Sequence, residues 1–261
     1  MRYWKVIIFV GLFFLGGQTL LAQKITTSGN LVDDEIWSGK VHVTGDVVVL
    51  KGLTLSIEAG TVITFADKGD YDITLPFGAN LGTDKCNLVI KGDLKIQGIE
   101  GNEVVIGERV YDLSAQSTIN WGGIIFDRVN TNSIIEYCIV RYADIGITFA
   151  GHSTAIITQN TIAENSVGIM VFESASPQIR SNRIHDNILW GISCYDYSFP
   201  MISKNIVEKN EVGIGSTDSS SPTIIHNTIA ENKVGILIQG KSKPWNANNK
   251  FIDNKEKIRI E

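Results

Sequence analysis

The stretch that decides the fold runs from residue 160 to 169 and reads NTIAENSVGI, and two close copies follow, NIVEKNEVGI from residue 205 and NTIAENKVGI from residue 227. The shared motif has one Asn, an apolar residue two positions later and a second Asn five positions after the first. Successive copies are 22, 23, 22 and 22 residues apart, and the extra residue lies within 188–190. A period kept this closely predicts stacked repeats. The motif begins at Asn160, Asn182, Asn205, Asn227 and Asn249.

Helical repeats do not fit this pattern, because the apolar segments 168–172 and 178–180 alternate or are very short. A repeat of this length with three short apolar segments is typical of one turn of a three-sided solenoid. We therefore predict an all-β fold, a right-handed parallel β-helix of about nine coils of about 22 residues. The Asn side chains are expected to hydrogen-bond to their equivalents one coil away and to adopt the left-handed backbone of tight corners.

Three segments are expected along the chain. Residues 1–22 resemble a secretory signal peptide, since Arg2 and Lys5 precede an apolar run that is too short to span a membrane. Residues 23–40 would form an N-terminal cap, and residues 41–261 the parallel β-helix. This predicts a secreted, periplasmic or cell-surface protein with no membrane span after cleavage.

Charge and cysteine content exclude several classes of function. A net charge of −5 and a pI near 5.4 give no reason to expect a nucleic-acid partner. Three cysteines make an odd number, so disulfides do not organise the fold. Neither the cysteines nor the four histidines show the spacing of metal ligands.

The repeated Asn motif, each copy with a Gly-Ile step such as Gly168-Ile169, resembles the parallel β-helix repeats of pectate-lyase-like proteins, of carbohydrate-binding and sugar-hydrolase domains and of the periplasmic copper-maturation protein NosD. The resemblance covers about residues 36–260. It implies the fold but no single activity, because lyases, hydrolases, epimerases and members without known activity share it. The Asp that polygalacturonase-like members carry before the Gly is replaced by Val167, Trp190, Val212 and Val234.

One coil carries an unusual number of aromatic residues beside a carboxylate. Aromatic faces stack on the apolar face of a sugar, and carboxylates hydrogen-bond to its hydroxyl groups. The candidate partner is therefore a polysaccharide or cell-surface glycan. The candidate ligand-binding residues are Phe172, Trp190, Tyr195, Asp196 and Tyr197.

Three acidic residues, Glu173, Asp196 and Asp218, occupy the same position of successive coils. Carboxylates stacked about 4.8 Å apart could bind Ca²⁺ or act as an acid–base pair, provided that the strands end just before them. These residues are the candidate metal ligands, Ca²⁺ is the candidate ion, and no other cofactor is expected. No catalytic residue is assigned.

The leading hypothesis from the sequence is a non-catalytic secreted or cell-envelope scaffold with a candidate glycan site. The first alternative is a polysaccharide lyase or hydrolase of the pectate-lyase-like superfamily that uses the three acidic residues. A weaker alternative is a copper-maturation protein like NosD, for which the sequence lacks clustered His, Met and Cys residues.

Overall fold

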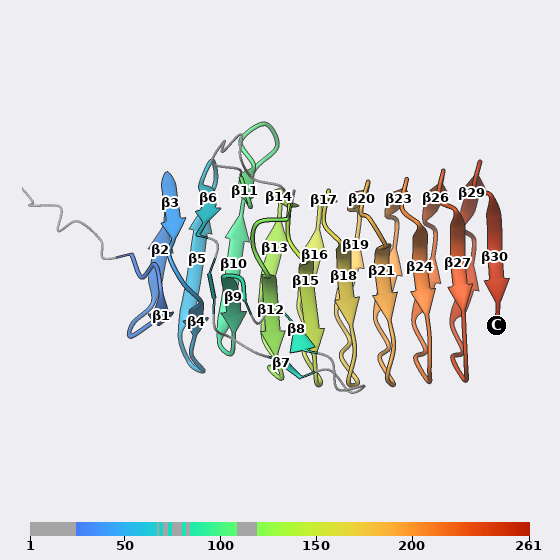
Figure 1. Ribbon diagram of the computed structural model, residues 1–261, viewed down its shortest axis with the longest axis horizontal. Coiled ribbons are helices and arrows are strands. Elements are labelled where there is room, and N and C mark those ends of the chain that lie inside the picture. The colour runs from blue at the N-terminus through green and yellow to red at the C-terminus, as the bar shows by residue number, and fades with distance from the viewer. Residues whose placement is uncertain (1–24, 67, 70–72, 75–79, 82–83, 109–118) are drawn as a thin grey trace, which may run out of the picture.

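The computed structural model describes residues 25–66, 68–69, 73–74, 80–81, 84–108 and 119–261. The expected signal peptide, residues 1–22, lies outside the described residues. The described part is all β, and it winds through three parallel sheets in turn, which confirms the predicted solenoid (Figure 1). No helix among these residues could cross a membrane.

Each coil contributes one strand to each sheet, in the order A, B, C. Sheet A contains β1 (Gly29–Asn30), β4 (Val47–Val49), β9 (Asn87–Ile90), β12 (Gly123–Asp127), β15 (Ile145–Ala150), β18 (Val167–Val171), β21 (Trp190–Cys194), β24 (Val212–Ser216), β27 (Val234–Ile238) and β30 (Glu256–Ile260). Sheet B contains β2 (Glu35–Trp37), β5 (Thr54–Glu58), β10 (Asp93–Gln97), β13 (Ile134–Glu136), β16 (Ile156–Thr158), β19 (Gln178–Arg180), β22 (Met201–Ser203), β25 (Thr223–Ile225) and β28 (Trp245–Ala247).

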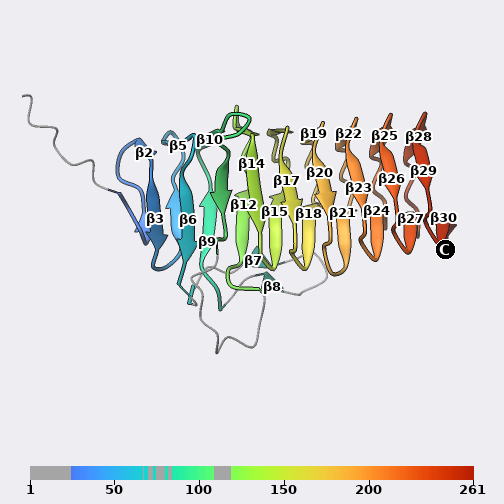
Figure 2. The ribbon, with the colours of Figure 1, turned by 90° about the horizontal axis from the view of Figure 1, so that it is seen from above.

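Sheet C contains β3 (Lys40–Val43), β6 (Val62–Phe65), β11 (Val104–Ile106), β14 (Cys138–Arg141), β17 (Thr161–Ala163), β20 (Arg183–His185), β23 (Ile206–Glu208), β26 (Thr228–Ala230) and β29 (Lys250–Ile252). A short antiparallel hairpin, β7 (Ile73–Thr74) and β8 (Asn80–Leu81), interrupts the winding between β6 and β9. Seen from above, the coils follow one straight axis, and the hairpin lies beside the stack near β12 and β15 (Figure 2).

Inward-facing side chains form columns that run along this axis. In sheet A, Ile147, Ile169, Ile192, Ile214 and Ile236 are register partners on successive strands, and each is fully buried. Sheets B and C add similar columns, so one continuous apolar core fills the space between the three sheets. Because each coil buries its apolar side chains only against its neighbours, the sequence period sets the register of the stack.

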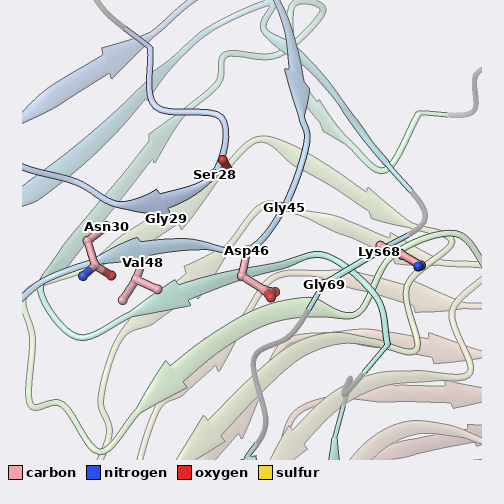
Figure 3. Close-up of a pocket in the computed structure, with 8 residues that line it drawn as sticks. All are labelled: Ser28, Gly29, Asn30, Gly45, Asp46, Val48, Lys68 and Gly69. Atoms are coloured by element: carbon pink, nitrogen blue, oxygen red, sulfur yellow. The ribbon is translucent and has the colours of Figure 1, made fainter.

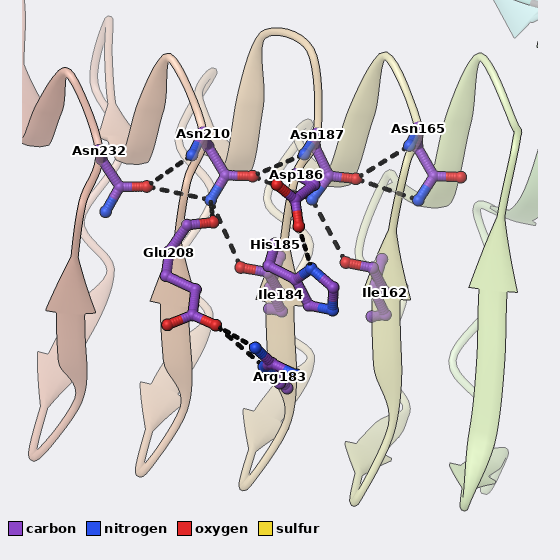
Figure 4. A network of polar contacts seen from close by, with 10 residues as sticks. All are labelled: Ile162, Asn165, Arg183, Ile184, His185, Asp186, Asn187, Glu208, Asn210 and Asn232. Carbon is purple, nitrogen blue, oxygen red and sulfur yellow. Dashed lines mark hydrogen bonds and ion pairs between the residues drawn. The ribbon is translucent and has the colours of Figure 1, made fainter. Parts of the chain in front are cut away.

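Two ladders of Asn side chains run through the corners beside sheet C, and Figure 4 shows the second of them. After the first Asn of each ladder, every Asn accepts hydrogen bonds on Oδ1 from the backbone N and the Nδ2 of the Asn one coil earlier, as Asn187 does from Asn165 at 3.2 and 3.1 Å. Its own Nδ2 also donates to a carbonyl of the preceding coil, that of Ile162 at 3.3 Å. The predicted ladder is therefore confirmed.

The expectation that these asparagines adopt the left-handed backbone was wrong. Positive φ falls on the residue before each Asn, for example Asp186 at 53° and Lys209 at 57°. This geometry turns the chain at the exposed residue and leaves the next side chain, the Asn, pointing into the corner. There its amide is buried and its hydrogen-bonding groups find partners on both neighbouring coils.

Candidate functional site

The candidate residues gather at the corner where the chain passes from sheet A to sheet B. The fifth residue after the Gly of each coil has positive φ, between 48° and 69°, along six successive coils. The strands of sheet A end one or two residues earlier, in agreement with the expected turn before the acidic residues. The column consists of Arg128, Gly151, Glu173, Asp196, Asp218 and Gly240.

Two of the five candidate ligand-binding residues are buried. Phe172 is 0% exposed and Tyr195 5%, and their rings stack with centroids 5.1 Å apart and planes inclined by 4°. They form an apolar cluster with Ile125 and Ala150 outside the main core. Apolar side chains of neighbouring coils pack on one another here and cover both rings, so neither ring is accessible for the ligand binding predicted from the sequence.

Trp190 also serves packing. Its half-buried ring lies over Gly215 of the next coil, where an added Cβ would overlap the ring. It packs against the buried apolar cluster of Val212, Val234 and Leu237. An indole ring held in this way has little face left for a ligand.

Tyr197 differs from the other candidates because its side chain is 66% exposed. It has positive φ, 57°, directly after Asp196, which also has positive φ. Such a backbone is uncommon for an aromatic residue and projects the ring away from the sheets. Phe199 and Met201, which follow it, are 53% and 48% exposed.

Trp245 extends this exposed apolar area along the axis. It is 69% exposed and lies in the same column of sheet B as Met201, two strands further along. Two strand spacings place the two backbones about 10 Å apart. We call Tyr197, Phe199, Met201 and Trp245 the Tyr197 surface.

A cation that sequence reasoning missed, Arg128, reaches the acidic residues. Its guanidinium pairs with Glu173 two coils away, Nη2 to Oε2 at 2.9 Å, and with Asp127, Nη1 to Oδ1 at 2.8 Å. The side chain lies across Gly151, where an added Cβ would come within 2.6 Å of Arg128 Cγ. Gly123 lies five residues before Arg128, so extending the column of acidic residues to earlier coils would have revealed it.

An open groove of about 620 Å³ lies on this corner beside Asp196. Within the groove, the negative charge of Glu173 is balanced by its ion pair with Arg128. Burial raises the pKa of the Tyr195 hydroxyl, and the nearby charges of Asp196, Glu173 and Asp218 raise it further, so this phenol stays protonated. The groove is lined by Arg128, Asn130, Gly151, His152, Glu173, Ser174 and Asp196.

The three acidic residues of this column are not gathered as a group of metal ligands in the described structure. Among the described residues, no three side chains of His, Cys, Asp or Glu come together so that they could hold a metal ion, and this includes Glu173, Asp196 and Asp218. One of the three, Glu173, is already paired with Arg128.

A second groove, of about 550 Å³, lies at the N-terminal end of the stack (Figure 3). Its one buried acidic residue, Asp46, is held by Asn87, whose backbone N and Nδ2 donate to Oδ1 at 2.7 and 3.0 Å. This carboxylate thus joins two coils of sheet A. The lining residues are Ser28, Gly29, Asn30, Gly45, Asp46, Val48, Lys68 and Gly69.

Comparison with known proteins finds one matching family. The family described as periplasmic copper-binding protein (NosD) matches residues 85–261. No curated protein matches the sequence. Among solved structures, the A-module of the mannuronan C-5 epimerase AlgE4 from Azotobacter vinelandii is similar, with 12% identity, 85% of this chain and 87% of that chain covered, and a TM-score of 0.34.

Proposed function

The chain belongs to the family of periplasmic copper-binding protein (NosD), and from this premise we propose that it is a β-helix scaffold of the periplasm that binds carbohydrate without transforming it. The family is described as periplasmic, which agrees with the secreted or periplasmic location expected from the sequence. The Tyr197 surface is the proposed binding site.

Exposed aromatic rings at the corner and on the adjoining sheet B are the observation that carries this proposal. Tyr197 and Trp245 present their rings to solvent at 66% and 69% exposure, and both are attached to a stack whose coils are held in register by the Asn ladders. Rings held in this way lose little conformational freedom when a sugar stacks on them. A pair of stacked aromatic rings contributes about 0.5–1.5 kcal/mol beyond the area that it buries, and we expect a similar contribution when a sugar stacks on a ring.

Asp196 adds a polar group beside the Tyr197 ring. The two oxygens of its carboxylate can accept hydrogen bonds from sugar hydroxyl groups. The neighbouring groove supplies further polar groups, among them Asn130 and Ser174. An apolar ring next to converging polar groups is the usual composition of a sugar site.

One observation favours the alternative, a polysaccharide lyase or hydrolase. Arg128 brings a guanidinium to Glu173, so a cation and carboxylates share one groove. In the described structure, however, both arms of this guanidinium are engaged by Asp127 and Glu173. We therefore propose binding rather than cleavage.

A polysaccharide panel tests the proposal. The purified chain is assayed for retention by each polymer and for release of unsaturated or reducing sugars. The informative variant is Tyr197→Gly, because Gly accepts the positive φ and only the ring is lost. We expect binding of at least one polymer, about tenfold weaker for the variant.

Lys204→Gly is the matched control, since Lys204 has the same φ of 57° and is exposed at the corner between sheets B and C, outside the groove. It should bind as the wild type does. Failure of every polymer to bind, or equal binding by Tyr197→Gly and the wild type, would overturn the proposed site. Release of sugars would establish the enzyme instead.

A further inference from the structure

We infer that this chain does not bind copper at a site of its own, although its family is described as copper-binding. The inference is independent of the proposed carbohydrate site. It rests on the positions of the side chains that copper prefers, which are imidazole for Cu(II) and thiolate or thioether for Cu(I). All four histidines and all three cysteines lie among the described residues, and so do Met170 and Met201.

The histidines are dispersed over the solenoid. His42 on β3 and His185 on β20 both belong to sheet C, but five strand spacings, about 24 Å, separate them. His152 lies at the corner between sheets A and B, and His226 at the corner between sheets B and C. No two imidazoles can therefore share one ion.

Two of the histidines already have partners. His185 Nδ1 lies 2.6 Å from Asp186 Oδ2 (Figure 4), and His42 Nδ1 lies 2.8 Å from Thr64 Oγ1. An acceptor on one ring nitrogen is common in metal sites, where it orients the other nitrogen towards the ion. Here further ligands do not complete a site, because no group of three His, Cys, Asp or Glu side chains in the described part of the chain could hold a metal.

The cysteines are interior packing residues. None of the three forms a disulfide, and each is at most 1% exposed. Cys194 takes the same inward column as Val171 and Ser216 on the neighbouring strands, and Cys138 begins β14 in sheet C. Burial raises the pKa of both these thiols, so the thiolate that would bind Cu(I) does not form at neutral pH.

The two described methionines face different surroundings. Met170 is half-buried on the outside of sheet A, and its sulfur accepts a hydrogen bond from the Tyr195 hydroxyl at 3.5 Å. Met201 lies on the exposed face of sheet B. A thioether is a weak ligand that needs others beside it, and no group of three His, Cys, Asp or Glu side chains in the described part of the chain offers them.

Competition with a coloured copper chelator tests the inference. The chain is purified from the periplasm and titrated into the chelator loaded with Cu(I) or with Cu(II). Glu208→His is the matched control, because His185 and Glu208 are register partners on adjacent outward positions of sheet C, and the change puts two imidazoles about 5 Å apart.

We expect the wild type to leave the colour unchanged at one equivalent and its melting temperature unchanged by either ion, whereas Glu208→His withdraws Cu(II). Withdrawal of one equivalent of copper by the wild type would overturn the inference. Loss of that copper on changing a single His, Cys or Met would then identify the site. Neither result depends on carbohydrate binding.

Discussion

Replacing one Asn in the middle of a ladder should destabilise the protein much more than replacing a charged residue beside it. Asn205 is 1% exposed, and its side chain makes four hydrogen bonds. Its Oδ1 accepts from the backbone N and the Nδ2 of Asn182, each at 3.0 Å. Its Nδ2 donates to the carbonyl of Ile179 at 2.9 Å and to Oδ1 of Asn227 at 3.0 Å.

The change Asn205→Leu fills a similar volume but removes all four bonds. Two donors of Asn182 then lose their acceptor in a buried corner where water does not reach. Each unsatisfied buried donor costs about 1–3 kcal/mol, so we expect the free energy of unfolding to fall by about 3 kcal/mol or more. For a domain of this size, that corresponds to a melting temperature lower by about 6–12 °C.

Glu208→Ala provides the comparison on the same coil. Glu208 pairs with Arg183, which is 54% exposed, and such surface pairs contribute at most about 1 kcal/mol (Figure 4). Asn249→Leu, at the last and partly exposed position of the same ladder, should have an intermediate effect because water can replace the lost partners. Thermal and urea denaturation measure all three. Equal midpoints for Asn205→Leu and Glu208→Ala would refute the role given to the ladder.

Three further predictions concern the outer face of sheet A, the corner column and the buried thiols. Gly215→Val should lower the stability by about 1–3 kcal/mol and expose the Trp190 ring, seen as a red shift of its fluorescence. A double-mutant cycle of Arg128→Gln and Glu173→Gln should give a coupling of at most about 1 kcal/mol that decreases with added salt. Burial raises the pKa of the Cys138 and Cys194 thiols, so the folded state keeps two protons that the unfolded state releases above about pH 8.5. The urea midpoint should therefore fall as the pH rises from 8 to 10. The fall should be smaller in the variant with both cysteines changed to Ala.

The fold could be predicted because each repeat has the same residue pattern and therefore the same local conformational preferences. The Asn at 160, 182, 205, 227 and 249 and the Gly-Ile steps mark equivalent points of each coil, so the period gives the stacking register without knowledge of any contact. The left-handed corners were assigned to the wrong residue. The residue that repeats in the sequence is the Asn, but the positive φ is found at the variable residue before it, such as Lys204 or His226.

The candidate site could be predicted less well, because strand parity does not distinguish an outward side chain from an exposed one. Phe172 and Tyr195 were candidate ligand-binding residues, yet apolar side chains of adjacent coils pack against them and both are buried. Arg128 was missed for a different reason: its partner Glu173 is two coils away, and Gly151 leaves the space through which the guanidinium reaches it.

The Asn ladders offer few hydrogen-bonding groups to a ligand, so the corners between sheets A and B are the better candidates for binding. The Asn side chains between Asn160 and Asn232 are at most 4% exposed, and their donors and acceptors are used between coils. A ligand would therefore be recognised by residues at the positions that vary from coil to coil. In the corner column, one backbone conformation holds a cation, two glycines and three carboxylates on successive coils. Only one of these coils adds an exposed aromatic ring directly afterwards, at Tyr197, and the proposed binding site is for this reason placed there.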